Sequence, residues 1–410
     1  MSKIKLLVLS IALAIFGYQP IFSQENVKKD GKETNVKKEL KVKPTVAFHG
    51  RIQYDFEFLK MKDGIAVGQD YEFNGQEFRR VYIEAGGAVY KNIKYKVQLE
   101  LAGGNVAYRD MYIKFAKLPY IGGDLAFGSM AEATGMDMAT SSKYISFIER
   151  AMMTNTQNFR WNSGIHYSNF GILDGKLGLQ MSYTFNGKHG DGFKVKKLEE
   201  GAHFVARLTS PIYQNKNKNQ VIHLGVNFEN RKRSKNPMDY TMKFRPENHM
   251  GSKVSVEFDS LNVQNDIGFE LAANFGPVSF QGEYEMGNYD RVSGTVGKVT
   301  GYYGALTYFV TGGHRGYKKG VGSRVKPYNN FCIKDGKFGA LELVLRYSSM
   351  DYTNIVTTGN NDKVNNITAG FNWYLNSHAR LMYNHVISDF NSAGDNNKLH
   401  ADLLRLQIDF

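Results

Sequence analysis

The sequence predicts an all-β fold, a transmembrane antiparallel β-barrel of about 16 strands. The first observation is that apolar and polar residues alternate with a period of two along most of the chain, the pattern of strands with one apolar face. The second is that no run of about 18 apolar residues follows the first 23 residues, so no spanning helix is expected. The third is the composition: 42 Gly, 25 Tyr and 27 Phe against 8 Pro suit many strands joined by turns.

Residues 1–23 have the features of a secretory signal peptide. Lys3 and Lys5 precede the apolar stretch LLVLSIALAIF, and Ser23 offers a small-residue cleavage point. A membrane anchor is the alternative, but the apolar stretch is too short for it. We therefore expect an exported protein. Its single cysteine, Cys332, allows neither an internal disulfide nor a cysteine-based metal cluster, and we expect no cofactor.

Residues 24–44 differ from the rest of the mature chain. They are charged and nearly free of large apolar side chains, so we expect a periplasmic tail or linker that does not order itself. From Thr45 to Phe410 the alternating texture is uniform, which predicts one barrel domain over residues 45–410. About 365 residues at about 10 per strand, with connections, account for the predicted strand number.

Individual strands can be read from the alternation. The stretch ITAGFNWYL places Ile367, Phe371 and Trp373 on one face and Thr368 and Asn372 on the other. Turn signals occur at 118–124, 173–176 and 334–337, and long polar connections are expected at 186–200, 230–250 and 388–398. Short turns on one side and long loops on the other are typical of outer-membrane barrels. Aromatic residues near strand ends are candidates for interfacial girdles: Tyr90, Tyr112, Tyr183, Tyr308, Phe309, Trp373 and Tyr374.

The chain ends in ADLLRLQIDF, which predicts the closing strand of the barrel. Leu404, Leu406, Ile408 and Phe410 share one face, which we expect to contact lipid. Arg405, Gln407 and Asp409 share the other, which we expect to line water.

Three stretches go further: FHGRIQYDF (48–56), EFRRVYIEAGGAVYKNIKYKVQLELAGGNV (77–106) and ATSSKYISFIER (139–150). In this order and spacing they resemble the phosphate-selective porin O/P family of Gram-negative outer membranes, and the resemblance runs from about residue 45 to the C-terminus. It implies a trimeric, 16-stranded porin in which a loop narrows each pore and arginines ring the constriction. A C-terminal aromatic residue such as Phe410 is what the barrel-assembly machinery recognises in this class.

The resemblance places the constriction arginines at Arg51, Arg79, Arg80 and Arg150. Arginine is always charged and offers a planar fork of donors to an oxyanion. Arg79 and Arg80 are adjacent, so both reach the lumen only where the strand ends or bulges, and otherwise one of them extends to the membrane interface. Two positions depart from the family. Met138 stands where the family has a lysine, and Arg109 where it has a carboxylate, so Arg109 joins the candidate ring.

The segment 314–326 matches a lysine-bearing region of the family. Lys318 and Lys326 are therefore candidates for an outer basic funnel that collects anions, and a solvated loop or contact with lipopolysaccharide phosphates is the alternative. The formal charge of +13 includes two lysines of residues 1–23, which leaves 13 − 2 = +11 for the remainder. Export makes nucleic acid an unsuitable partner for this basic surface.

The sequence thus predicts an outer-membrane porin of a Gram-negative bacterium that passes small anions, phosphate or polyphosphate among them, by passive diffusion. A weakly selective general porin is the alternative, and a barrel enzyme is a further one. The ten histidines form no paired catalytic motif and no nucleophile elbow is present, so we expect no enzyme.

Overall fold

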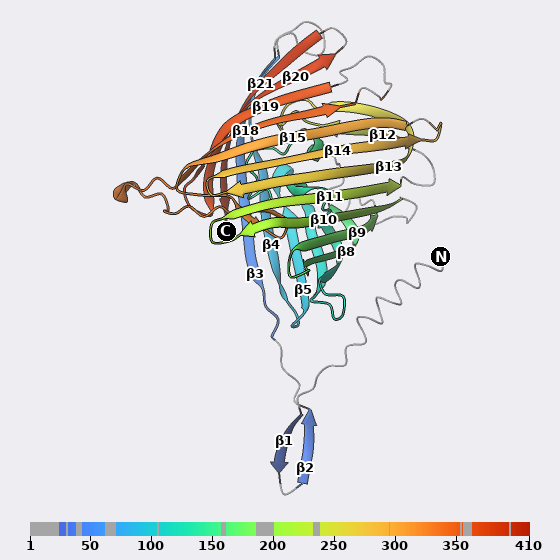
Figure 1. The fold of residues 1–410 in the computed structure, drawn as a ribbon, viewed down its shortest axis with the longest axis vertical. Helices are drawn as coiled ribbons and strands as arrows, with labels where there is room; N and C mark the ends of the chain where they lie inside the picture. The colour runs from blue at the N-terminus through green and yellow to red at the C-terminus, as the bar shows by residue number, and fades with distance from the viewer. Residues whose placement is uncertain are drawn as a thin grey trace.

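The computed structural model describes residues 24–29, 32–37, 43–61, 71–104, 106–156, 161–185, 201–232, 238–294, 296–352, 355, 363–392 and 395–410. The predicted signal peptide and the expected loop 186–200 lie outside these residues. Figure 1 shows long strands that wrap around a common axis. They are β3 (Ala47–Met61), β4 (Tyr71–Ala88), β5 (Ile93–Glu100), β6 (Ala107–Ala116), β7 (Asp124–Ala131), β8 (Trp161–Ile172), β9 (Leu177–Phe185), β10 (Ala202–Asn215), β11 (Gln220–Lys232), β12 (Met238–Phe244), β13 (Val254–Phe275), β14 (Val278–Arg291), β15 (Val296–Thr311), β18 (Ala340–Asp351), β19 (Lys363–Tyr374), β20 (Ala379–Ser392) and β21 (Asp395–Asp409).

These strands form one closed antiparallel barrel. β11 and β12 both pair with the 22-residue β13, end to end along it, so they act as one interrupted strand. Counted this way, the described residues give sixteen strand positions, and the predicted strand number is confirmed. Among the same residues, no helix has both the length and the apolar character needed to cross a membrane.

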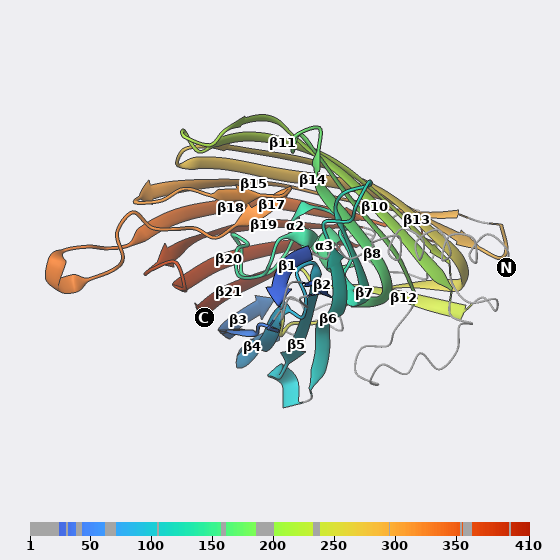
Figure 2. The same cartoon turned by 90° about the horizontal axis from the view of Figure 1, so that it is seen from below.

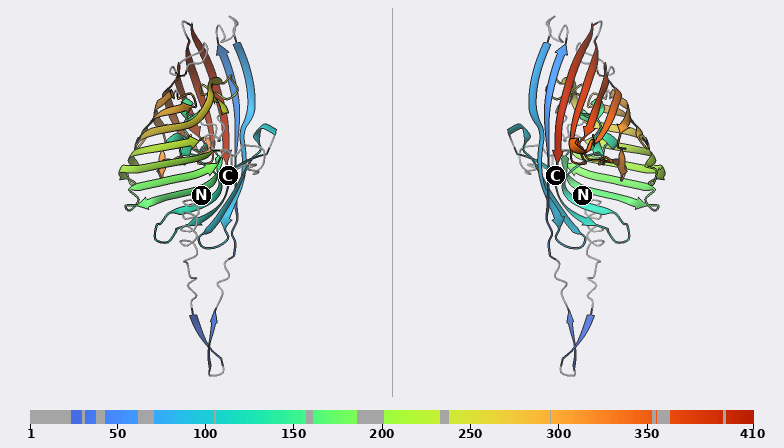
Figure 3. Two further views of the ribbon diagram at one scale, coloured as in Figure 1. Left: turned by 90° about the vertical axis from the view of Figure 1, so that its right-hand side faces the viewer. Right: turned by 90° about the vertical axis from the view of Figure 1, so that its left-hand side faces the viewer.

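The barrel closes between its first and last strands, as Figure 3 shows with blue β3 beside the red C-terminal strands. Gly50 and Phe410 exchange two backbone hydrogen bonds, at 2.9 and 3.2 Å. A Cβ atom on Gly50 would overlap the Phe410 ring, so a larger residue at position 50 would force that ring to move. The predicted faces are confirmed, since Leu406, Ile408 and Phe410 are exposed on the outer wall and Arg405 and Gln407 are buried inside.

The two rims differ in their connections. One rim carries the short turns, such as those after β8 and β10, together with Phe410, and we call it the short-turn rim. The other, the long-loop rim, carries the connections after β3, β7 and β12. The expected long loop 388–398 is wrong, because β20 and β21 extend through most of it and leave only residues 393–394 between them.

Several finer expectations also change. Phe309 and Tyr374 are buried together inside the short-turn rim rather than in an outer girdle, with ring centroids 5.9 Å apart, whereas Tyr183 and Tyr308 are exposed. Within the charged segment 24–44, β1 (Gln24–Lys29) and β2 (Lys32–Lys37) pair as a hairpin beyond the barrel (Figure 1), and its assignment as a tail or linker stays a prediction. No barrel strand pairs with that hairpin among the described residues, and an isolated two-stranded hairpin is only marginally stable in water.

Candidate functional site

The connection between β7 and β8 folds into the barrel, and we call its residues 132–156 the lumenal loop. It contains two short helices, α2 (Met136–Ala139) and α3 (Met152–Asn155), which Figure 2 shows inside the ring of strands. Ile148 and Met152 are fully buried and pack on apolar residues of the inner wall such as Phe258 and Met350. The apolar side chains of the loop therefore fix it against one side of the lumen, as burial of such groups is favourable.

Polar groups of the wall hold the lumenal loop at two separated places. The Glu283 carboxylate on β14 accepts the backbone N–H groups of Met136 and Asp137, at 2.9 and 2.7 Å. On the far side, the N–H of Ile148 donates to Asn384 Oδ1 of β20, at 2.8 Å. Since β14 and β20 are separated by three other strands on their shorter side, the loop crosses the interior.

A row of side chains from the last strands holds the loop's carbonyl oxygens. Each donor comes from an inward position of β18, β19, β20 or β21. The bonds are Arg346 to Glu149 O at 3.1 Å, Asn372 to Ser146 O at 2.8 Å, Arg380 to Ile145 O at 2.8 Å, Arg405 to Ile148 O at 2.5 Å and Gln407 to Lys143 O at 3.2 Å. Bonds from charged donors are the stronger kind, so this row defines the loop's path.

A second connection also enters the lumen, at residues 245–253 between β12 and β13. The Glu57 carboxylate on β3 accepts the backbone N–H groups of His249 and Met250, at 2.9 and 2.8 Å. Glu247 pairs with Arg346 at 2.6 Å. The lumen toward the long-loop rim is therefore occupied by two inserted connections rather than by one.

Arg79 and Arg80 both face the lumen because β4 bulges there. Gln53 of β3 pairs with Arg80, but the next residue, Tyr54, pairs with Phe78, so Arg79 has no register partner on β3. An extra residue of this kind shifts the alternation by one position. The alternation of the sequence required the strand to end or bulge if both Arg79 and Arg80 were to reach the lumen, and this bulge meets that requirement.

The five candidate ring residues have different surroundings. Arg51 donates to Ser142 Oγ of the lumenal loop, and its guanidinium lies 4.3 Å from the Tyr82 ring centroid. Arg80 donates to Gln53 Oε1 at 2.9 Å. Arg79 forms a two-bonded pair with Glu149, at 2.8 and 3.1 Å. Arg150 lies within the loop and donates to Asp137 O at 2.9 Å and Thr140 O at 2.6 Å. Arg109 pairs with Glu100 at 3.0 Å and lies over the Trp161 ring.

Several of these cations are neutralised by carboxylates. Glu149 accepts from both Arg79 and Arg405, and Arg405 also forms a two-bonded pair with Asp55 at 2.7 and 2.6 Å. Burial would raise the pKa of Glu149, but the charges of Arg79, Arg80 and Arg405 outweigh it and hold that pKa well below its usual range. This carboxylate therefore stays ionised and cancels part of the ring's charge.

Three arginines form what we call the cation cluster: Arg51, Arg80 and Arg380. None of them has a carboxylate within ion-pair distance among the residues that the structure describes. They gather around the loop backbone at Ser142, whose carbonyl accepts from Gln53 at 3.1 Å and from Arg380 at 3.5 Å. Gln407 accepts from Gln53 at 2.6 Å and from Arg380 at 2.9 Å, which closes the network.

The cation cluster retains capacity for a further acceptor. Arg380 Nε is buried and donates to no acceptor in the described part of the chain. Lys143, which follows Ser142 in the lumenal loop, indicates a positive local potential. Burial lowers its pKa, and the charge of Arg51 lowers that pKa further. Uncompensated positive charge of this kind attracts anions.

The alternation of the last strands could have identified Arg380, Arg346 and Arg405, which the candidate ring omits. All three take inward positions of β18, β20 and β21. The choice among them could not have been made from the sequence, because it depends on which arginine meets a carboxylate from a distant strand or loop.

Basic residues also occur toward the short-turn rim. A cavity of about 430 Å³ is lined by Lys94, Lys96 and Lys114, with Glu84 among them. Lys318 and Lys326 are exposed in the connection between β15 and β18, which belongs to the same rim. The two lysines assigned from the sequence to an outer funnel thus lie on the short-turn rim.

Comparisons with known proteins agree on the family and the fold. A family model described as phosphate-selective porin O and P matches residues 46–410. Porin O of Pseudomonas aeruginosa is 26% identical over 390 residues, which cover 85% of this chain and 84% of that protein. The anion-selective porin from Comamonas acidovorans gives a TM-score of 0.57 at 14% identity, covering 90% of this chain and 100% of that one. The outer membrane channel DcaP of Acinetobacter baumannii gives 0.55 at 11% identity, covering 90% and 98%. At such identities the two structures establish a shared fold alone.

Proposed function

Because the chain belongs to the phosphate-selective porin O and P family, we propose that its pore favours small anions and that phosphate is the candidate solute. The chain is an outer-membrane porin, and porins are channels rather than enzymes. Two descriptions support the anion preference, since the family is described as phosphate-selective and a structural neighbour as anion-selective.

The cation cluster is the observation that carries the proposal. Arg51, Arg80 and Arg380 lie beside the lumenal loop, and no described carboxylate lies within ion-pair distance of them. A unit charge about 4 Å from a permeating ion changes its energy by about 1 kcal/mol even in water. An anion that passes the cluster is therefore favoured and a cation is disfavoured. Because several moderate contacts act in place of one deep site, release remains possible.

Other basic residues extend the path on both sides of the cluster. In this proposal Arg79, Arg109 and Arg150 contribute less, because carboxylates or loop carbonyls already engage them. Since short turns are periplasmic in bacterial barrels, Lys318 and Lys326 would serve the periplasmic mouth, together with the lysine-lined cavity.

The pairing of the other cations favours a second candidate, a weakly selective porin. Arg79, Arg109 and Arg405 each meet a carboxylate, so most of the lumen is nearly balanced in charge. Phosphate specificity would then be absent, in keeping with Met138 at the position where the family has a lysine.

The same proposal covers assembly and partners. We place the barrel in the outer membrane as a trimer, in contact with lipid and lipopolysaccharide and exported by residues 1–23. Phe410, exposed at the end of β21, is the candidate contact of the assembly machinery.

Reversal potentials in planar bilayers under a KCl gradient test the proposal. The wild-type pore should be anion-selective, and Arg80→Gln should reduce the selectivity. The matched control is Arg109→Gln, which removes the same charge from a neutralised pair and should have a smaller effect. A wild-type potential near zero, or one of cation selectivity, would leave only the weakly selective porin. Phosphate titrated against the chloride current then decides specificity, because block below millimolar concentration supports phosphate and weaker block supports anions in general.

A further inference from the structure

The connection between β15 and β18 has two halves, one inside the barrel and one outside it. Its first half, residues 313–325, enters the lumen. Arg315 pairs with Glu342 at 2.6 Å and donates to Tyr144 O at 2.8 Å, and Gly320 O accepts from Arg207 at 2.7 Å. The small hairpin of β16 (Gly316–Lys318) and β17 (Val321–Ser323) lies in this half. The second half, residues 326–339, turns to the outside of the barrel, and we call it the arm.

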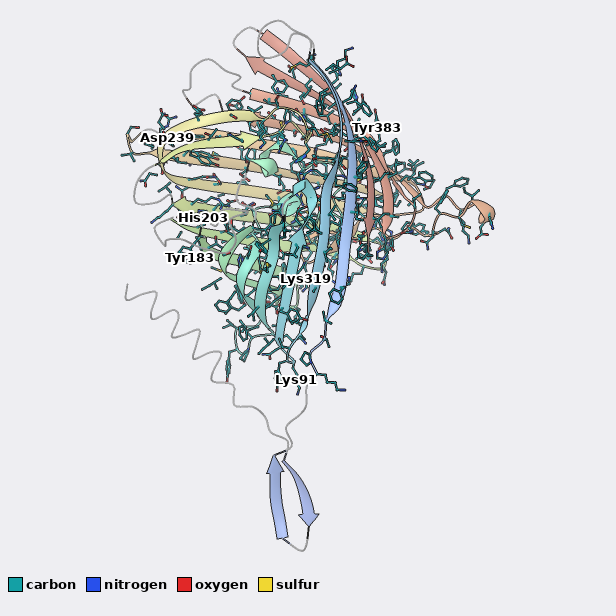
Figure 4. All side chains as sticks on the ribbon, turned by 180° about the vertical axis from the view of Figure 1, so that it is seen from behind. Lys91, Tyr183, His203, Asp239, Lys319 and Tyr383 are labelled. Carbon is teal, nitrogen blue, oxygen red and sulfur yellow. The ribbon has the colours of Figure 1, made fainter. Side chains whose placement is uncertain are left out.

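The arm is held in place by backbone bonds. The N–H of Tyr328 donates to Gly312 O and the N–H of Phe331 to Leu375 O, both at 2.7 Å. At its tip Cys332 and Lys337 exchange two backbone bonds, at 2.8 and 3.0 Å. These hydrogen bonds give the arm a defined conformation. Figure 4 shows that its side chains project away from the barrel wall.

The base of the arm rests on the outer face of the barrel. The Phe331 ring packs edge-on against Trp373, with centroids 5.1 Å apart, and Trp373 Nε1 donates to Phe338 O at 2.7 Å. Trp373 takes an outward position of β19, one residue before that strand ends at the rim. The outward residues Tyr308, Val310 and Leu343 of the neighbouring strands are exposed and continue the same apolar surface.

The arm combines exposed apolar groups with positive charge. Tyr328, Phe338 and Ile333 are 65, 69 and 79% exposed. Three lysines accompany them, Lys326, Lys334 and Lys337, and the only acidic residue of the arm is Asp335, which lies 3.5 Å from Lys337. Large apolar groups in water at the rim of a membrane barrel are unfavourable unless another phase covers them. Apolar groups beside lysines suit the boundary between acyl chains and anionic headgroups.

We propose that the arm is a membrane anchor that inserts at the headgroup boundary of the leaflet next to the short-turn rim. Tyr328, Ile333 and Phe338 enter the acyl region, and Lys334 and Lys337 at the tip of the arm contact anionic phospholipid headgroups. Continuity with the outward apolar surface and the excess positive charge favour lipid over a protein partner. The proposal is independent of ion selectivity in the pore.

The single native cysteine makes a direct test possible. In a Cys332→Ser background, an environment-sensitive fluorophore is attached after Ile333→Cys, and the full-length protein is reconstituted in vesicles that contain phosphatidylglycerol. Two positions serve as controls: Leu345→Cys on the outward face of β18 reports lipid, and Lys216→Cys in a short turn of the same rim reports water. Heat-modifiable migration on a gel shows that each variant is a folded barrel.

The Ile333 probe should be quenched by nitroxide-bearing lipid, as the Leu345 probe is, and should be protected from aqueous iodide. Lys334→Glu combined with Lys337→Glu should shift the Ile333 probe toward iodide accessibility in anionic vesicles and should change it less in phosphatidylcholine vesicles. Quenching like that of the Lys216 probe would overturn the proposal, because the arm would then lie in water. A probe shielded from both quenchers would overturn it as well, because a protein surface would then cover the arm.

Discussion

Removal of the Glu283 carboxylate should loosen the lumenal loop without unfolding the barrel. Glu283 accepts two loop N–H groups, from Met136 and Asp137, and also the Tyr303 hydroxyl. In Glu283→Ala both backbone donors lose their acceptor. A buried donor left unpaired costs about 1–3 kcal/mol, so this end of the loop loses about 2–6 kcal/mol of docking free energy. Since lumenal water can reach the freed groups, we expect the lower end, and about 2 kcal/mol raises the undocked population about 30-fold.

Single-channel recording in planar bilayers measures this change. Glu283→Ala should raise the mean conductance and add open-channel noise, because the loop samples undocked positions. Glu285→Ala is the matched control, since it truncates the same type of side chain two residues along the same strand and this side chain makes no bond to the two loop N–H groups. Conductance and noise equal to wild type in Glu283→Ala, or an equal change in both variants, would refute the role of Glu283 as the loop's anchor.

Three further outcomes are expected. Arg405→Met leaves Asp55 buried without its partner and should cost about 3–5 kcal/mol, seen as a lower urea concentration for loss of the compact gel form; an unchanged midpoint would contradict it. The Glu149 carboxylate, with its depressed pKa, contributes stability that is complete above the ordinary carboxyl pKa and is lost as pH falls through the depressed value, so the unfolding midpoint of the wild type minus that of Glu149→Gln should be constant from pH 7 to about 5 and should shrink below about pH 4; a difference that stays constant below about pH 4 would show that the pKa of Glu149 is not depressed. Met138→Lys adds a cation to the lumenal loop, where Met138 is buried, and should strengthen phosphate block of the chloride current about fivefold, as a contribution of about 1 kcal/mol would; no change would mean that position 138 does not act on the ion path.

The alternation of the strands made the barrel predictable. The closing strand shows this clearly, because the faces of Leu406 and Arg405 follow from the period of two alone. The same rule predicted that Arg79 and Arg80 require a bulge to share a face, although the bulge itself depends on the register with β3.

The charge balance of the lumen could not be predicted in this way. Glu149 neutralises Arg79 across 70 residues of sequence and Arg405 across 256, and no local pattern encodes such distances. Arg380 is missing from the predicted ring for the same reason. It matters because no described carboxylate lies within ion-pair distance of it, and the sequence does not show this. The sequence also could not predict on which rim Lys318 lies, because that depends on the exact number of strands that precede it.

The β3–β21 seam has a consequence for the order of folding. Leu399 pairs with Met61 and Asp409 with Arg51, so the contacts that close the ring join residues more than 300 positions apart. Contacts of such long range form slowly, and no earlier strand can replace β21 as the partner of β3. Until β21 docks, β3 and β20 present long unpaired edges of the kind that template aggregation. The chain must therefore remain shielded along its whole length before it enters the membrane, and its last strand decides when that protection can end.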